Sequence, residues 1–144
     1  MDRRSKAREL AVQALYQLDV LGNYFIAELA AFLRENADDE GVRRLADEWT
    51  RATWKNVAAC DELIRSAAIK WELSRLSTVD RAILRLGAYQ IRFCTDIPGK
   101  VVINEAIEIA KKYSGEQAPR FINGVLDAIL RKVNADLNRA SPPD

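Results

Sequence analysis

Apolar residues recur every three or four positions through almost the whole chain of 144 residues. This spacing is typical of amphipathic α-helices, and the alternation at every second position that marks a half-buried strand is sustained nowhere. The six glycines and four prolines fall mostly where the helical period breaks, as at Gly22, at Pro98-Gly99 and between Gly115 and Pro119. The sequence therefore predicts an all-α protein.

The period predicts about seven helices joined by short turns. We expect them at residues 4–20, 25–36, 41–57, 59–73, 78–94, 100–113 and 119–134. Nothing in TWKNVAACDELI is a firm stop, so the sequence leaves open whether the third and fourth helices are continuous. A length of 144 residues is typical of one domain. We expect that domain at residues 1–140, followed by a disordered tail at 141–144 that contains Pro142-Pro143.

The helix expected at 78–94 is apolar around most of its circumference, which predicts a central place in the core. Ser77 or Thr78 can cap its start, and Asp80 stands in the first turn, where a carboxylate is favoured. The sequence leaves open whether Asp80 is only an acid near the helix cap or a functional residue. The narrow polar strip of this helix consists of Arg81, Arg85 and Arg92. We interpret that strip as a solvated edge paired with neighbouring acids.

The residue types that most enzymes need are missing. The chain has no histidine, which removes the commonest general base and the commonest metal ligand. Walker-type GxxxxGK, GxGxxG, GxSxG and CxxC motifs are absent as well. Glu105 and Glu108 precede Lys111 and Lys112 by about one turn, which indicates a lattice of ion pairs rather than a catalytic carboxylate pair. We expect no catalysis, no metal and no cofactor.

Bulk charge predicts no partner, because 22 Lys and Arg oppose 21 Asp and Glu. Any nucleic-acid site must therefore come from uneven placement of charge. No apolar run approaches the roughly 20 residues of a membrane span, and no signal peptide is recognisable. Cys60 and Cys94 have no accompanying metal ligands and are interpreted as buried thiols in a reducing compartment. Together these features predict a cytoplasmic protein with no membrane association.

Charge is unevenly placed at the N-terminus. Four of the first eight residues are basic: Arg3, Arg4, Lys6 and Arg8. Cations at a helix start oppose the helix dipole by about 0.3–1 kcal/mol each, so something other than helix stability favours them there. An ordinary solvated terminus is the competing interpretation. Tyr16, on the outward face of the same helix, is likewise open between a partner contact and a plain surface residue.

The segment PRFINGVLDAILRKV predicts a helix whose weak helix formers lie on its outer side. Asn123 and Gly124 project beside Arg120, and Phe121 lies at the edge of the apolar side. Backbone amides at a helix start, a cation and an aromatic ring suit a phosphate and a stacked base. A simple loop-to-helix junction accounts for the same residues.

Three segments resemble the transcription antitermination factor NusB family. They are RRSKARELAVQALYQLDV, STVDRAILRLGAYQI and DIPGKVVINEAIEIAKKYSGEQAPRFINGVLDAIL. They follow the family's order over nearly the whole chain, and INEAIEIAKKY…RFINGVLD is highly specific, whereas residues 22–76 match only as a helical pattern. The resemblance implies two small helical bundles packed together. It also implies a non-enzymatic role, in which the chain and the ribosomal protein NusE bind boxA RNA and help RNA polymerase read through terminators in ribosomal RNA operons.

The resemblance also implies roles for individual residues. It assigns contacts with RNA phosphates to Arg3, Arg4, Lys6 and Arg8. Arg120 and Phe121 are assigned to RNA, with Lys111 and Asn123 as weaker candidates, and Tyr16 and Asp80 to the protein-partner side, with a role at the RNA border left open. The start has fewer consecutive arginines than is usual in the family, which predicts weaker RNA affinity. The loop SGEQAPRF carries Pro119, so the family's contacts there do not transfer residue by residue.

Other interpretations stay open at this point. NusB-like domains also occur ahead of cytosine methyltransferase domains that act on ribosomal RNA, and this chain would then be the accessory domain. A purely protein-binding helical adaptor is the other class. The sequence does not fix the oligomeric state, and a homodimer that hides the RNA surface is compatible with it.

Overall fold

The computed structural model describes residues 2–140, and within that range every regular element is a helix. The α-helices are α1 (Arg3–Leu21), α2 (Leu29–Asn36), α3 (Glu40–Lys55), α4 (Val57–Ala67), α5 (Thr78–Phe93), α6 (Gly99–Tyr113) and α7 (Ala118–Ala140). Two short 3-10 helices, η1 (Asn23–Glu28) and η2 (Leu73–Arg75), lie in the connections. The all-α prediction is confirmed. The tail expected at 141–144 lies outside the described residues.

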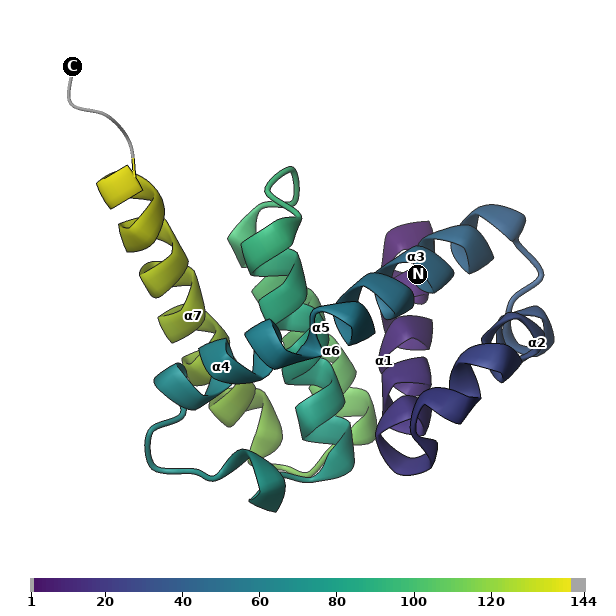
Figure 1. The fold of residues 1–144 in the computed structure, drawn as a ribbon, viewed down its shortest axis with the longest axis horizontal. Coiled ribbons are helices and arrows are strands. Elements are labelled where there is room, and N and C mark those ends of the chain that lie inside the picture. The colour runs from purple at the N-terminus through teal and green to yellow at the C-terminus, as the bar shows by residue number, and fades with distance from the viewer. Residues whose placement is uncertain (1, 141–144) are drawn as a thin grey trace.

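The helices form two small bundles, as the sequence resemblance implied (Figure 1). Helices α1, α2 and α3 make the N-terminal bundle, and α4, α6 and α7 gather around α5 in the other. Helix α5 also packs against α1 and α3, so it belongs to both bundles. This confirms the central place predicted for it.

Helix α5 holds this place because its start is capped and its sides are apolar. The Ser77 hydroxyl accepts a hydrogen bond from the Asp80 backbone amide at 3.2 Å, which satisfies a free donor of the first turn. Apolar side chains buried along α5 are Ala82, Ile83, Leu84, Leu86, Ala88 and Ile91. Gly87 lets α7 approach closely, because a Cβ atom there would lie 2.8 Å from a methyl group of Leu126.

Two arginines of α5 form ion pairs at the interior, Arg85 buried and Arg81 partly buried. Arg85 is 8% exposed, and its Nε and Nη2 donate to the Asp61 carboxylate on α4 at 2.8 and 3.0 Å. Its Nη1 lies 3.5 Å from Asp19 on α1, which also accepts a hydrogen bond from Arg81 Nε at 2.7 Å. The predicted pairing with acids is confirmed. The predicted solvated edge is wrong for Arg81 and Arg85, and only Arg92 of the strip is exposed.

Helix boundaries differ from the predictions in the first half of the chain. Residues 23–28 form a 3-10 turn ahead of α2, where a continuous helix was expected. Helices α3 and α4 are separate, because Asn56 leaves helical geometry (φ −103°, ψ 19°) while its side chain donates to the Ala52 carbonyl at 2.8 Å. Such side-chain bonds to the backbone compete with helix continuation.

The C-terminal ends of α4 and α7 also differ from the predictions, α4 ending earlier and α7 later than expected. Helix α4 ends at Ala67 instead of reaching residue 73, and the side chains of Ile69 and Trp71 in the following linker are 86% and 57% exposed. A helical period read from these apolar residues was misleading because they do not pack on the core. Helix α7 continues past 134 to residue 140, since no Gly or Pro interrupts it before Pro142.

The cysteines are free thiols. Cys60 is fully buried, and burial raises the pKa of its thiol to about 12. Cys94 is only partly buried, so the prediction of buried thiols holds in full for Cys60 alone. Within residues 2–140, no helix is both long and apolar enough to cross a membrane.

Replacing Arg85 with methionine should lower the free energy of unfolding by about 3–5 kcal/mol, because Asp61 would be left buried without its partner. The matched control is Arg92→Met on the same helix, where the exposed guanidinium lies over the Phe93 ring. That change should cost less than about 0.5 kcal/mol. Urea unfolding of both variants measures the difference, and equal losses would contradict the role assigned to Arg85.

Candidate nucleic-acid interface

Arg3 stands at the start of α1, as the sequence predicted. Asp2 caps the helix, its carboxylate accepting a hydrogen bond from the Ser5 amide at 2.8 Å. The Arg3 guanidinium donates to both carboxylate oxygens of Asp39 at 3.0 and 2.7 Å and so joins α1 to the start of α3. Both side chains are well exposed, and pairs of this kind contribute about 0–1 kcal/mol. A phosphate can therefore compete with Asp39 for Arg3.

Arg4 and Lys6 are the cations of this segment that have no anionic partner. Neither forms an ion pair or a side-chain hydrogen bond with another described residue. Arg4 is exposed and Lys6 is half-buried. Unpaired cations at the surface are suited to contacts with phosphates, since no existing bond must be broken.

Arg8 is placed differently from the expectation. It is 3% exposed, and its guanidinium donates to Gln90 Oε1 and Glu105 Oε1, each at 3.2 Å. Its charge also lies over the Trp49 ring, with 5.1 Å between Cζ and the ring centroid. These contacts join α1 to α3, α5 and α6. The Arg8 guanidinium does not reach the surface in this structure, so it is not available for the phosphate contact that was expected of it.

Glu9, the next residue of α1, is buried beneath the same surface. It is 5% exposed and accepts hydrogen bonds from Lys112 Nζ at 2.8 Å and from the Tyr113 hydroxyl. Burial by itself raises the pKa of Glu9, but the hydrogen bonds from Lys112 and Tyr113 outweigh it and leave the pKa below its ordinary value. The buried carboxylate thus fixes the end of α6 against α1.

The predicted ion-pair lattice on α6 is confirmed in part. Lys111 Nζ lies 3.3 Å from Glu108 in an exposed pair. Lys112 instead pairs with Glu9, and Glu105 accepts hydrogen bonds from Arg8 and from the Ser5 hydroxyl. Lys111 remains at the surface, beside a shallow groove between α1 and α6.

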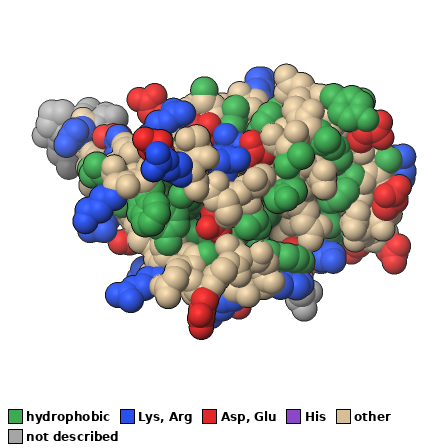
Figure 2. Space-filling view, turned by 90° about the horizontal axis from the view of Figure 1, so that it is seen from below, with side chains coloured by type: hydrophobic (Ala, Val, Ile, Leu, Met, Phe, Trp, Pro, Cys, Tyr) green, Lys and Arg blue, Asp and Glu red, His purple; other side chains and the backbone are tan. Residues whose placement is uncertain are grey.

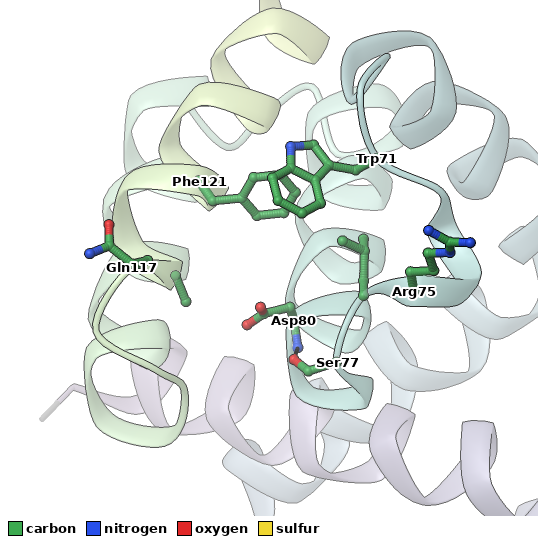
Figure 3. Close-up of a pocket in the computed structure, with 8 residues that line it drawn as sticks. Trp71, Arg75, Ser77, Asp80, Gln117 and Phe121 are labelled. Atoms are coloured by element: carbon green, nitrogen blue, oxygen red, sulfur yellow. Dashed lines mark hydrogen bonds between the residues drawn. The ribbon is translucent and has the colours of Figure 1, made fainter.

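A second groove lies where α5 and α7 begin (Figure 3). It has a volume of about 240 Å³ and is lined by Trp71, Arg75, Leu76, Ser77, Asp80, Gln117, Ala118 and Phe121. The rings of Trp71 and Phe121 meet edge to face, with 5.6 Å between centroids and 69° between planes. The Asp80 carboxylate accepts a hydrogen bond from the Ser114 hydroxyl at 2.5 Å. Asp80 and Phe121, which the sequence assigned to different partners, therefore share one groove.

The outer side of α7 next to this groove is open. Arg120, Asn123 and Gly124 are exposed, and Arg120 forms no ion pair with a described residue. A Cβ atom at Gly124 would meet nothing within 4 Å, so packing within the chain does not require glycine there. The projection that placed Asn123 and Gly124 on the outer side is confirmed.

Tyr16 lies in a third groove between α1 and its neighbours. Its side chain is 41% exposed, and the groove has a volume of about 470 Å³. The lining consists of Val12, Gln13, Tyr16, Gln17, Phe32, Val79 and Tyr113. The Gln13 amide donates to the Tyr113 hydroxyl at 3.1 Å. Tyr113 thus stands between the Tyr16 groove and Glu9.

Figure 2 shows the molecule from below, toward the end that carries the linker between α4 and α5 in Figure 1. Hydrophobic side chains gather in patches on this face, and Lys and Arg side chains lie among and around them. Asp and Glu side chains lie on the same face, so its charge is mixed.

Sequence comparison decides the family. The NusB family model matches residues 5–131. The chain belongs to the NusB family. A transcription antitermination protein NusB of Desulfitobacterium hafniense is 42% identical over 135 residues, covering 91% of this chain and 90% of the relative. Its counterpart in Bacillus cereus is 44% identical over 129 residues, covering 88% and 96%.

Solved NusB structures share the fold. NusB of T. maritima is 37% identical and superimposes with a TM-score of 0.76, covering 92% of both chains. A crystal structure of the antitermination factors NusB and NusE in complex with dsRNA matches with a TM-score of 0.83 at 27% identity, covering 92% of this chain and 98% of that one.

Sequence reasoning missed Trp71, Lys112 and Tyr113 as parts of this NusB surface. Trp71 was assigned to the helix 59–73, although the polar run around Ser74 and Ser77 was an available signal for a loop. Lys112 and Tyr113 gave no signal, because their partner Glu9 is more than 100 residues earlier in the chain.

The buried Glu9 should make stability depend on pH in the acid range. Its folded-state pKa is lowered, so its ion pair stabilises the fold above the unfolded-state pKa, which lies near 4.3, and that contribution is lost as pH falls through the folded value. The difference in unfolding free energy between the parent and Glu9→Gln should therefore be larger at pH 7 than at pH 3. Chemical unfolding at both values measures it.

The matched control for this experiment is Glu108→Gln, which alters a carboxylate in the exposed pair with Lys111. It should leave the pH dependence nearly unchanged. A difference between parent and Glu9→Gln that stays constant from pH 7 to pH 3 would contradict the assigned role of Glu9.

Proposed function

We propose that this chain is a transcription antitermination factor that binds boxA-type single-stranded RNA together with a NusE-type ribosomal protein. In this role it promotes read-through of ribosomal RNA operons by the RNA polymerase antitermination complex. The observation that carries the proposal is membership of the NusB family over residues 5–131. The similarity of the fold to NusB in a complex with NusE and RNA supports it.

Surface cations supply the contacts with phosphates. Arg4, Lys6 and Arg120 are free of ion pairs within the described residues, and Arg3 and Lys111 form only exposed pairs. Each neutralised phosphate of a single strand contributes about −0.7 to the slope of log affinity against log salt. A handful of such contacts on a protein of net charge +1 gives modest, salt-sensitive binding.

The ring of Phe121 supports an RNA that is single-stranded at this point. The RNA in the similar solved complex is double-stranded. In this chain, however, Phe121 is half-buried at the edge of an open groove, where an unstacked base can lie against its ring. Asn123 lies about half a turn further along α7, and its exposed amide can donate or accept hydrogen bonds next to that base.

The protein partner is assigned to the region around Tyr16. Tyr16 presents an amphipathic ring at the mouth of a largely apolar groove, and aromatic residues of this kind are enriched in the centres of protein interfaces. Val79 lines the Tyr16 groove, and the next residue, Asp80, lines the groove that contains Phe121. This position is consistent with a place for Asp80 at the border between the RNA and the ribosomal protein.

The proposed role consists of binding alone. It requires neither catalysis nor a cofactor, and it takes place in the cytoplasm, where RNA polymerase produces the nascent transcript. The alternative of a purely protein-binding adaptor predicts no salt-dependent RNA affinity, and this separates the two.

The double variant Arg120→Glu with Phe121→Ala should weaken RNA binding at least about tenfold, because loss of one stacked base costs about 1–3 kcal/mol. The slope of log affinity against log salt should become less steep by about 0.7, the contribution of one phosphate contact. Fluorescence anisotropy with a labelled boxA-type RNA, with and without the NusE-type protein, measures both quantities.

The matched control for charge is Lys132→Glu, an exposed cation about 18 Å further along α7. It should bind RNA nearly as well as the parent, and circular dichroism should show all variants folded. Equal RNA affinity of the double variant and the parent would refute the site.

A further inference from the structure

Of the four cations in the basic start of α1, Arg3 alone is paired with an exposed acid of the described chain. Its Nε and Nη2 donate to the two carboxylate oxygens of Asp39 at 3.0 and 2.7 Å. Arg4 and Lys6 have no such partner, and Arg8 is buried. Arginine forms the same two parallel hydrogen bonds with carboxylates and with phosphates. Asp39 therefore binds Arg3 in the way that a phosphate group would.

The Asp39 carboxylate is held in place by the start of α3. Asp39 caps this helix, and its Oδ1 accepts hydrogen bonds from the backbone amides of Gly41 and Val42 at 2.8 and 3.2 Å. The hydrogen bonds from Arg3 and from these amides hold the pKa of Asp39 below its ordinary value, so the carboxylate is charged at neutral pH. Asp39 is thus a fixed acceptor, and the long Arg3 side chain is the part of the pair that can move.

Gly41 leaves the space that the Arg3 guanidinium occupies. A Cβ atom at Gly41 would lie 2.1 Å from Arg3 Nη2, which is too close for two atoms that are not bonded. Gly41 does not have a positive φ, so the backbone itself does not require glycine in this first turn of α3. The glycine therefore serves the close approach of Arg3 to Asp39.

Two further acids flank Asp39. Asp38, Asp39 and Glu40 are consecutive, and all three are exposed. Glu40 lies 3.6 Å from Arg44 in an exposed pair, whereas the Asp38 side chain forms no ion pair or hydrogen bond with a described residue. The basic start of α1 therefore lies beside a row of negative charges, and such a row resembles the phosphates that this segment is proposed to bind.

A purely structural tie between α1 and α3 is the competing interpretation of the pair. The two helices already pack against each other. The side chains of Arg3 and Asp39 are 69% and 45% exposed, and ion pairs between exposed side chains contribute little to stability. Glycine inside a helix also weakens that helix. Stability therefore does not account for a glycine that makes room for this pair.

From this geometry, and resting on the proposed function, we infer that the pair of Arg3 with Asp39 is an autoinhibitory contact that lowers RNA affinity. In the RNA-free protein, Asp39 occupies the guanidinium in place of a phosphate. RNA binding transfers Arg3 from Asp39 to a phosphate, while Asp39 keeps its bonds to the amides of α3. Because one ion pair is exchanged for another, Arg3 adds less to RNA affinity than an unpaired arginine would.

The autoinhibitory contact acts on the part of the affinity that does not depend on RNA sequence. Contacts between arginine and phosphates supply this part, and base contacts supply the discrimination between sequences. Weakening the phosphate contribution leaves tight binding to those RNAs that also gain base contacts and the contacts of the ribosomal protein. Asp39 thus favours selective binding over strong binding.

The first test is Asp39→Asn, which removes the charge and keeps the helix cap, since asparagine caps helices as well as aspartate does. The affinity of the complex with the NusE-type protein should rise about two- to fivefold, because no exposed ion pair has to be broken. The rise should be similar for boxA-type and scrambled RNA, and largest at low salt. Fluorescence anisotropy with both labelled RNAs measures it.

The matched control is Asp38→Asn, which removes an equal charge from the adjacent position without touching Arg3. Its affinity should stay within about 1.5-fold of the parent, because exposed charges that are not in contact are largely screened at physiological salt. A second control repeats both substitutions in an Arg3→Gln background. There, Asp39→Asn should raise RNA affinity no more than Asp38→Asn does, because the cation that Asp39 holds is gone.

The second test is Gly41→Ala, which changes no charge. Its Cβ atom takes the place of the Arg3 guanidinium and displaces that flexible group from Asp39. RNA affinity should again rise about two- to fivefold, and the rise should be absent in the Arg3→Gln background. Circular dichroism shows whether each variant is folded, and the substitutions at Asp39 test the inference even if Gly41→Ala does not fold.

The outcomes separate this inference from the proposed function. If the parent complex binds no boxA-type RNA, the proposed function fails and the inference fails with it. If the parent binds this RNA but Asp39→Asn leaves the affinity unchanged, only the autoinhibitory contact is refuted. If Asp38→Asn gives an equal gain, or if the gain of Asp39→Asn persists without Arg3, Asp39 acts by general repulsion and the inference is overturned.

Discussion

The buried ion pairs of α5 hold the two bundles together. Arg85 joins Asp61 of α4 to Asp19 of α1, and Arg81 reinforces Asp19 from the next turn. Buried charges are tolerated only when their partners stay in place, so α1 cannot shift against α4 without leaving a charge unpaired. The cations at the start of α1 and the Phe121 ring at the start of α7 belong to different bundles. Their relative position therefore depends on this network.

A second set of polar contacts links the two parts of the proposed RNA surface. Glu9 of α1 is bonded to Lys112 and Tyr113 at the end of α6, and the adjacent Ser114 is bonded to Asp80 in the aromatic groove. Through the consecutive residues Lys112, Tyr113 and Ser114, these hydrogen bonds connect α1 with the groove. Buried charges in this protein position exposed ones, and under the proposed function this lowers the ordering cost of RNA binding.

Most of the fold was predictable because apolar side chains report burial through their spacing. The centrality of α5 and the outward face of Asn123 followed from this alone. The spacing of charged residues does not show whether they are buried. Arg8 and Glu9 lie on a surface-like stretch of sequence but are buried, because Gln90, Glu105 and Lys112 bond to them from 82 or more residues away. Trp71 was misplaced for the opposite reason, since an apolar residue in a loop imitates the helical period.

The central claim is that this chain and a NusE-type ribosomal protein together recognise boxA-type RNA. The most direct measurement is to co-purify the two proteins and titrate the complex, and each protein alone, against a boxA-type RNA and a scrambled RNA of equal length and composition. The account predicts that the proteins co-purify, that the complex binds boxA-type RNA more tightly than either protein alone, and that it prefers this RNA over the scrambled one. Equal binding of the two RNAs by the complex, or no gain on adding the partner, would contradict it.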